Sequence, residues 1–128
     1  KHSFPTRRSS DLIATFEHPR YEMYGSGTVF DGEEEVRGYF HASRTPFPDQ
    51  GNEIIAIAHV DNSVLVEFWL TGTHKGPLKM GGKTIGPTGK SFRVRMAASF
   101  EFPPGGDKII CERPYFDPTQ IAKALDLA

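Results

Sequence analysis

The clearest helical pattern in this chain lies in the segment DGEEEVRGYFHASR, residues 31–44. Its apolar side recurs at spacings of three and four residues, through Val36, Tyr39, Phe40 and Ser43. Asp31 and Glu34 have the spacing of a capping box, and the three glutamates of the first turn complement the helix dipole. Because prolines follow shortly after Arg44, we predict a helix over residues 31–44.

Most of the chain after this helix has the pattern of β-strands. Residues 52–60 and 63–74 flank Asp61-Asn62, which predicts a hairpin. Residues 91–102 alternate, and their apolar side chains share one face: Phe92, Val94, Met96, Ala98, Phe100 and Phe102. Residues 108–116 predict a last strand.

Three further segments complete the pattern. Residues 14–25 indicate a short strand entering a loop, and residues 75–90, with five glycines and two prolines, indicate a long loop. Asp117-Pro118 predicts the start of a C-terminal helix. A helix, four antiparallel strands and a short helix favour an α+β domain, with helices packed on one face of a curved sheet.

Composition excludes several classes of function. The chain has 128 residues and a formal net charge of −1, without a basic stripe for nucleic acid or an apolar run long enough to span a membrane. Its single cysteine, Cys111, permits no internal disulfide, and a cytoplasmic location is the default. The five histidines lack metal-ligand spacing, so we expect neither metal nor cofactor.

The first residues have no helical or strand pattern. The run from His2 to Leu12 agrees with one reading frame of a common short-read sequencing adapter, so we interpret residues 1–12 as a non-native tail of metagenomic origin. We therefore expect the domain to comprise residues 13–128 and to lack its natural N-terminus.

Three motifs, in this order, resemble the SnoaL-like branch of the nuclear transport factor 2 superfamily. They are GTHKGPL at 72–78, PTGK followed by an alternating strand at 87–102, and ERPYFDPTQIAKALDL at 112–127. The resemblance implies a cone-shaped, strongly bent antiparallel sheet around an apolar cavity, with two N-terminal helices that are truncated here. Family members include polyketide cyclases, ketosteroid isomerases and limonene epoxide hydrolases, as well as domains without chemistry.

The family's enzymes place a catalytic Asp on the last strand, directly before the YF of the last motif. In this chain that position is Pro114, which has no proton to exchange. This departure argues against a direct transfer of the family's usual activities.

Two other carboxylates are candidates for acid/base catalysis. Glu112 shares a strand face with Pro114, and the resemblance implies that Glu67 and Trp69 face the cavity. A carboxyl group in an apolar cavity has a raised pKa and can act as a general acid or base. The alternative is that each glutamate pairs with an arginine on a neighbouring strand. His18 is a third candidate, because relatives place a polar pocket residue beside the first strand.

The resemblance also indicates which side chains line the cavity. We expect a ligand-binding surface composed of Phe40, Trp69, Val94, Met96, Ala98, Pro114, Phe116 and Ile121, although the same side chains could simply fill the core. The predicted function is binding of a small hydrophobic molecule, with isomerase, cyclase or hydrolase chemistry. The alternative is a non-catalytic domain for ligand binding or dimerisation, since homodimers are common in the family.

Overall fold

The computed structural model describes residues 2–4 and 12–127 of the chain. Its elements, in chain order, are β1 (His2–Phe4), β2 (Arg20–Glu22), β3 (Val29–Asp31), α2 (Glu33–Arg44), β4 (Gly51–Val60), β5 (Ser63–Thr73), β6 (Leu78–Met80), β7 (Lys83–Ile85), β8 (Ser91–Glu101), β9 (Cys111–Tyr115) and α3 (Thr119–Ala124). Seven strands form one sheet in the order β1-β4-β5-β8-β9-β2-β3, and β6 and β7 form a second, two-stranded sheet. Neighbours in the large sheet are antiparallel except β2 and β9, which pair in parallel.

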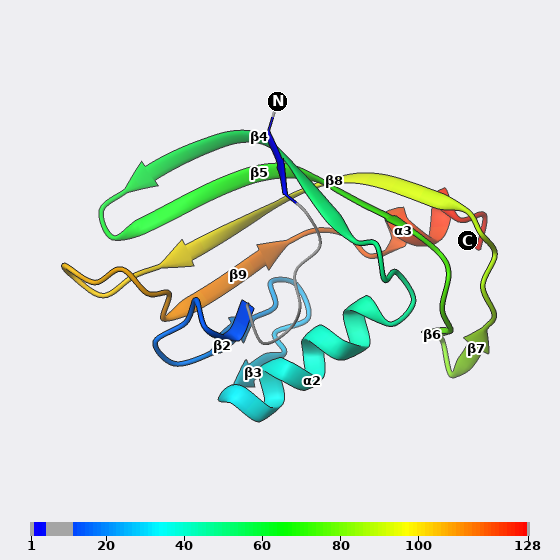
Figure 1. Ribbon diagram of the computed structural model, residues 1–128, viewed down its shortest axis with the longest axis horizontal. Helices are drawn as coiled ribbons and strands as arrows, with labels where there is room; N and C mark the ends of the chain where they lie inside the picture. The colour runs from blue at the N-terminus through cyan, green and yellow to red at the C-terminus, as the bar shows by residue number, and fades with distance from the viewer. Residues whose placement is uncertain (1, 5–11, 128) are drawn as a thin grey trace.

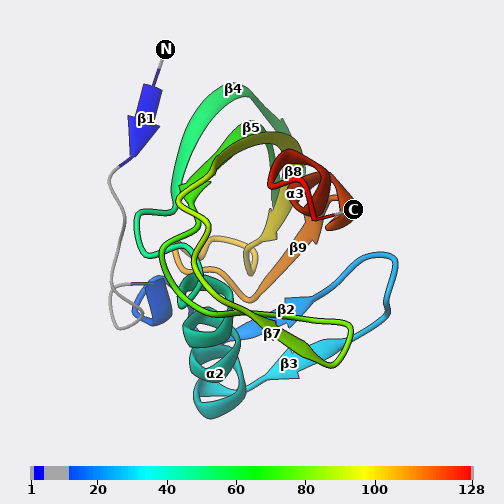
Figure 2. The same cartoon turned by 90° about the vertical axis from the view of Figure 1, so that its right-hand side faces the viewer.

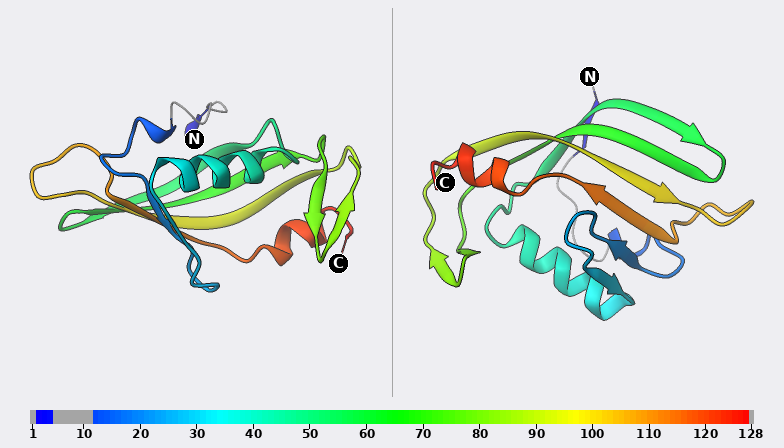
Figure 3. Two further views of the ribbon diagram at one scale, coloured as in Figure 1. Left: turned by 90° about the horizontal axis from the view of Figure 1, so that it is seen from below. Right: turned by 180° about the vertical axis from the view of Figure 1, so that it is seen from behind.

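The large sheet is strongly curved, and α2 lies on its concave side (Figure 1). A view turned by 90° shows the strands bending around the space above α2, with α3 beside β8 and β9 (Figure 2). Seen from below, α2 lies over the strands of the sheet (Figure 3). This arrangement confirms the predicted α+β class with a curved antiparallel sheet.

The predicted helix forms, but its first turn differs from the expectation. Gly32, not Asp31, is the N-cap residue, and no side chain caps the helix. The Asp31 carboxylate instead pairs with Arg20 at 3.2 Å, while its backbone N–H donates to Glu35 at 2.8 Å. Among the described residues, no helix combines the length and apolar composition needed to cross a membrane.

Two groups of buried side chains join the helices to the sheet. The first group connects α2 with β2 and the preceding turn and consists of Ile13, Phe16, Tyr21, Val36 and Phe40. Leu12, which we assigned to the non-native tail, packs against this group. The second group connects β8 with the C-terminal segment and consists of Phe47, Phe92, Val94 and Leu125. The concave face between the two groups is left available for a cavity.

The predicted hairpin is confirmed, and so is the apolar face predicted for the first part of β8. β4 and β5 are joined at Asp61-Asn62, where Asp61 has a φ of 53° and Val60 pairs with Ser63. In β8, Phe92, Val94 and Ala98 are buried, as the alternation requires. The C-terminal helix also forms after Asp117, whose carboxylate accepts a hydrogen bond from the Thr119 N–H at 3.0 Å.

The sequence analysis expected no strand at His2–Phe4, which pairs with β4, and it missed two short hairpins. The segment interpreted as a long loop contains the β6–β7 hairpin, which turns at Gly81-Gly82 with φ values of 58° and 78°. β2 and β3 form a second short hairpin, and β3 leads directly into α2. In both cases the strands have only three residues, too few for alternation to be visible in the sequence.

The end of α2 is fixed against the start of the β6–β7 segment at Gly76. The backbone N–H of Gly76 donates to the Pro46 carbonyl at 3.1 Å, and a Cβ on Gly76 would lie 2.1 Å from the Thr45 carbonyl oxygen. We expect Gly76→Ala to lower the free energy of unfolding by about 2 kcal/mol or more, since backbone must move to admit the methyl group. Chemical denaturation of the variant measures this change.

Gly86→Ala is the matched control, because a Cβ at Gly86 would meet no atom within 4 Å. Its free energy of unfolding should stay within about 1 kcal/mol of the parent chain. Equal stability of the two alanine variants would show that α2 is not held by this close backbone contact.

Candidate functional site

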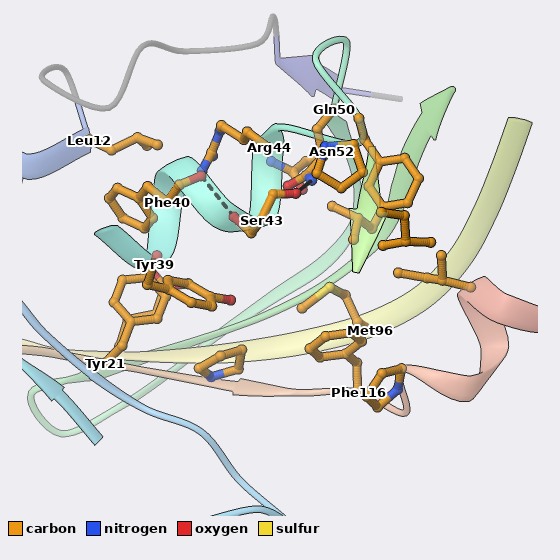
Figure 4. Close-up of a pocket in the computed structure, with 18 of the residues that line it drawn as sticks. Leu12, Tyr21, Tyr39, Phe40, Ser43, Arg44, Gln50, Asn52, Met96 and Phe116 are labelled. Carbon is orange, nitrogen blue, oxygen red and sulfur yellow. Dashed lines mark hydrogen bonds between the residues drawn. The ribbon is translucent and has the colours of Figure 1, made fainter. Parts of the chain in front are cut away.

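A cavity of about 430 Å³ lies between the concave face of the sheet, α2 and the start of α3. Apolar side chains dominate its wall, and its residues include Tyr21, Tyr39, Phe40, Phe68, Leu70, Leu78, Met96, Pro114, Phe116 and Ile121. Polar side chains enter it from α2 and the segment that follows, namely Ser43, Arg44, Gln50 and Asn52 (Figure 4). Figure 4 places the two tyrosines on one side of the cavity and Met96 with Phe116 on the other.

Among the described residues that line this cavity, Glu112 is the only acidic one. It belongs to β9, where the alternation of the strand turns Glu112 and Pro114 to the cavity side. Tyr21 stands directly opposite Glu112 in the parallel pairing of β2 and β9, and its hydroxyl donates a hydrogen bond to the Glu112 carboxylate. The carboxyl group is therefore held at a fixed place in the cavity wall.

Burial controls the ionisation of Glu112. Removal from water raises the pKa of Glu112 from 4.5 to about 7, although the hydrogen bond from Tyr21 and the charge of Arg44 act in the opposite direction. The two protonation states are thus similarly populated near neutral pH. A carboxyl group with such a pKa can both accept and donate a proton.

The two cavity tyrosines remain protonated under the same conditions. Burial, together with the nearby charge of Glu112, raises the pKa of Tyr39 to about 12, and burial raises the pKa of Tyr21 well above its usual value. Their rings lie 5.1 Å apart between centroids. Both phenols are therefore hydrogen-bond donors in this part of the cavity.

Arg44 brings a positive charge into the cavity wall from the last turn of α2. Its Nε is buried and has no hydrogen-bond partner in the described part of the chain, and its guanidinium lies 5.1 Å from the centre of the Phe40 ring. Burial lowers the pKa of Arg44, but a guanidinium stays protonated in proteins.

The placement of Glu67 and Trp69 in the cavity is wrong. Both side chains lie on the outer face of the sheet, where Glu67 pairs with Arg95 at 3.1 Å and Trp69 lies beneath Arg93 at 4.1 Å. The reason is the alternation of side chains along β5. Phe68 and Leu70 point into the cavity, so Glu67 and Trp69, which alternate with them, point to the opposite face of the sheet. Glu67 therefore forms an ion pair with an arginine of a neighbouring strand, which was the alternative to a catalytic role.

The other predicted site residues are divided between the cavity and its surroundings. Phe40, Met96, Pro114, Phe116 and Ile121 line the cavity, and their roles stay predictions. His18 lies away from it, with 61% of its side chain exposed and its Nε2 at 3.1 Å from Asp31. Val94 and Ala98 are buried in the core and are absent from the cavity wall.

Sequence reasoning missed Arg44, Tyr39 and the neighbouring amides as cavity residues. A signal for Arg44 was present, because Val36, Phe40 and Arg44 are spaced by four residues and share one side of α2. In the described part of the chain, no cluster of His, Cys, Asp or Glu could hold a metal ion.

Solved structures with similar folds come from several bacteria. A protein with a ketosteroid isomerase-like fold from Catenulispora acidiphila, in complex with trimethylamine, has a TM-score of 0.75 and 17% identity, with 96% of this chain and 85% of that chain covered. IdmH from Streptomyces antibioticus, a candidate polyketide cyclase, has a TM-score of 0.71 and 21% identity, with 93% and 89% covered. A candidate SnoaL-like polyketide cyclase from Jannaschia has a TM-score of 0.71 and 19% identity, with 85% and 71% covered.

These identities are low, so the structural similarity establishes the fold alone. None of the curated proteins matches the sequence of this chain. A family model described as SnoaL-like domain, however, matches residues 5–111. The match begins within the segment that we interpreted as a non-native tail and ends one residue before Glu112. Since it covers most of the sequence, the chain belongs to the family of SnoaL-like domains.

Proposed function

We propose that this protein binds a small, mainly apolar molecule in the cavity and catalyses proton transfer on it, with Glu112 as general acid and base. The observation that carries the proposal is a carboxyl group in an apolar cavity, hydrogen-bonded to Tyr21, with a pKa of about 7. General acid/base catalysis is most effective when the pKa of the catalytic group is near the working pH.

The cavity supports a reaction at a carbon atom next to a carbonyl group. Ionised Glu112 takes a proton from this carbon, the resulting negative charge moves to the carbonyl oxygen, and the protonated carboxyl group returns the proton to another carbon of the ligand. Tyr39 stays protonated and can donate a hydrogen bond to the developing oxyanion. Proton transfers of this kind agree with the names ketosteroid isomerase-like and polyketide cyclase given to similar structures.

A second candidate function is non-catalytic binding or dimerisation, and two observations favour it. Pro114 lines the cavity where the family's enzymes have their catalytic Asp. On the outer face of the sheet, Leu65 of β5, which shares this face with Glu67 and Trp69, is 48% exposed. Homodimerisation through this face and a cytoplasmic location stay predictions.

Proton exchange on a simple ketone tests the catalytic proposal. We expect the protein to accelerate deuterium exchange at the α-carbon of 2-tetralone in D₂O buffer, followed by NMR. Glu112→Gln should reduce the catalysed rate by about 10²-fold or more, because the amide keeps the shape of the carboxyl group but cannot accept the proton.

Glu67→Gln is the matched control for this experiment. It makes the same chemical change on the outer face of the sheet, outside the cavity, so its exchange rate should equal that of the parent chain. If Glu112→Gln exchanges as fast as the parent, Glu112 is not the base. If the parent chain shows no acceleration, the non-catalytic alternative is favoured.

The ionisation of Glu112 has a consequence for stability that requires no ligand. The native state holds this proton more tightly than the unfolded chain, so the contribution of Glu112 to stability is complete below about pH 4.5 and is lost as the pH rises through about 7. The change in pKa from 4.5 to about 7 corresponds to roughly 3 kcal/mol.

We therefore expect Glu112→Gln to gain stability relative to the parent chain between about pH 5 and pH 8, by up to roughly 3 kcal/mol. Urea denaturation of both proteins at the two pH values measures this difference in the free energy of unfolding. The contributions of titrating groups that both proteins share cancel when the two are subtracted. A difference independent of pH would mean that the pKa of Glu112 is not raised in the folded state.

A further inference from the structure

Arg44 brings into the cavity wall a charge for which the described part of the chain supplies no ion pair. Its Nε is buried without a hydrogen bond, and the described ion pairs of the protein involve other residues. An unsatisfied buried donor is costly, and more so when it is charged. A ligand that supplies an acceptor to Arg44 would remove this cost.

The side chains around Arg44 determine which chemical groups such a ligand needs. The charged and titratable groups in the cavity wall are Glu112 on β9, Tyr21 on β2, Tyr39 on α2 and Lys79 on β6. Glu112 attracts Arg44 through space and forms a hydrogen bond with Tyr21, but none of the described ion pairs joins Glu112 to Arg44. Ser43, Gln50 and Asn52 line the same cavity and add neutral polar groups.

A planar guanidinium binds carboxylates with paired, charge-assisted hydrogen bonds, which are stronger than those between neutral groups. The rest of the cavity, around Met96, Phe116 and Ile121, offers apolar contact. An apolar ligand without an anionic group would bury Arg44 further and leave its charge uncompensated.

We infer that the cavity selects a small acid, a molecule with an apolar ring system and one carboxylate that binds Arg44. This inference rests on the proposed function, because it assumes that the cavity is the ligand site, and it names the class of ligand. The carboxylate occupies the side of the cavity near the end of α2, and the ring system lies against β8, β9 and α3.

Ionised Glu112 repels this carboxylate, whereas protonated Glu112 does not. Binding of an anion should therefore be strongest with Glu112 protonated and should weaken as the pH rises through neutrality. Tyr21 and Tyr39 do not titrate in this range, because the pKa of each phenol is raised. Lys79 is exposed.

Two probes with the same ring system test the inference by calorimetry, 2-naphthoic acid and the uncharged 2-naphthamide. At pH 6.5 the acid should bind the parent chain at least tenfold more tightly than the amide. Arg44→Met should weaken binding of the acid by tenfold or more and change binding of the amide less than threefold. Arg44→Lys should retain part of the preference, because it keeps the charge but loses the paired geometry.

Arg37→Met is the control, since Arg37 lies on the same helix, is exposed and pairs with Glu33. This variant should bind both probes like the parent chain. In Glu112→Gln, the affinity for the acid should no longer fall between pH 6 and pH 8. Circular dichroism of each variant confirms that it is folded.

The outcomes separate this inference from the proposed function. Equal affinity of the parent chain for acid and amide, or an undiminished preference in Arg44→Met, would overturn the selection of an acid and leave the cavity as a binding site. If neither probe binds, the inference falls, and exchange of 2-tetralone then decides whether the catalytic proposal survives. A tenfold preference that disappears in Arg44→Met and persists in Arg37→Met supports the inference.

Discussion

The pairing of β5 with β8 fixes which side chains the cavity contains. The two strands remain in register from Ser63 opposite Glu101 to Thr73 opposite Ser91. Directly opposite residues in an antiparallel pair share a face of the sheet, so the pair Phe68 and Met96 faces the cavity. A shift of one residue in either strand would turn outer-face residues such as Glu67 or Arg95 toward the cavity. The apolar wall of the cavity therefore depends on this register.

The cavity differs from the rest of the core because charged side chains enter its wall. Val36 and Phe40 on α2 are buried among apolar side chains, but Arg44, one turn further, directs a guanidinium into the same layer. Glu112 does the same from β9. Groups that lower stability and yet occupy fixed positions in a cavity are typical of functional sites. The two charges are also of opposite sign, which makes their joint burial less costly than that of either alone.

Periodicity in the sequence was sufficient to locate an element that is long and has one apolar face. It located α2, the β4–β5 hairpin and the inward face of β8. In β5 it failed, because both faces carry apolar residues, and the family resemblance then suggested the wrong face for Glu67 and Trp69. The uninterrupted apolar row through Val66, Phe68 and Leu70 was the better guide. The pairing of Tyr21 with Glu112 joins residues far apart in the sequence, so no local pattern could reveal it.

The family resemblance predicts a catalytic Asp at the position of Pro114, so under the proposed function the acid/base group lies elsewhere in the cavity. Pro114 has no N–H to donate, although its carbonyl accepts from the Tyr24 N–H at 3.4 Å, and β2 pairs with β9 at Glu112. Two residues along a strand correspond to about 7 Å, so the carboxyl group of Glu112 lies that much further from the C-terminal end of β9. This displacement brings it beside Tyr21 and within the electrostatic reach of Arg44. A ligand held by both groups would therefore react at an atom close to α2, and a substrate placed for an Asp at position 114 would not be correctly oriented.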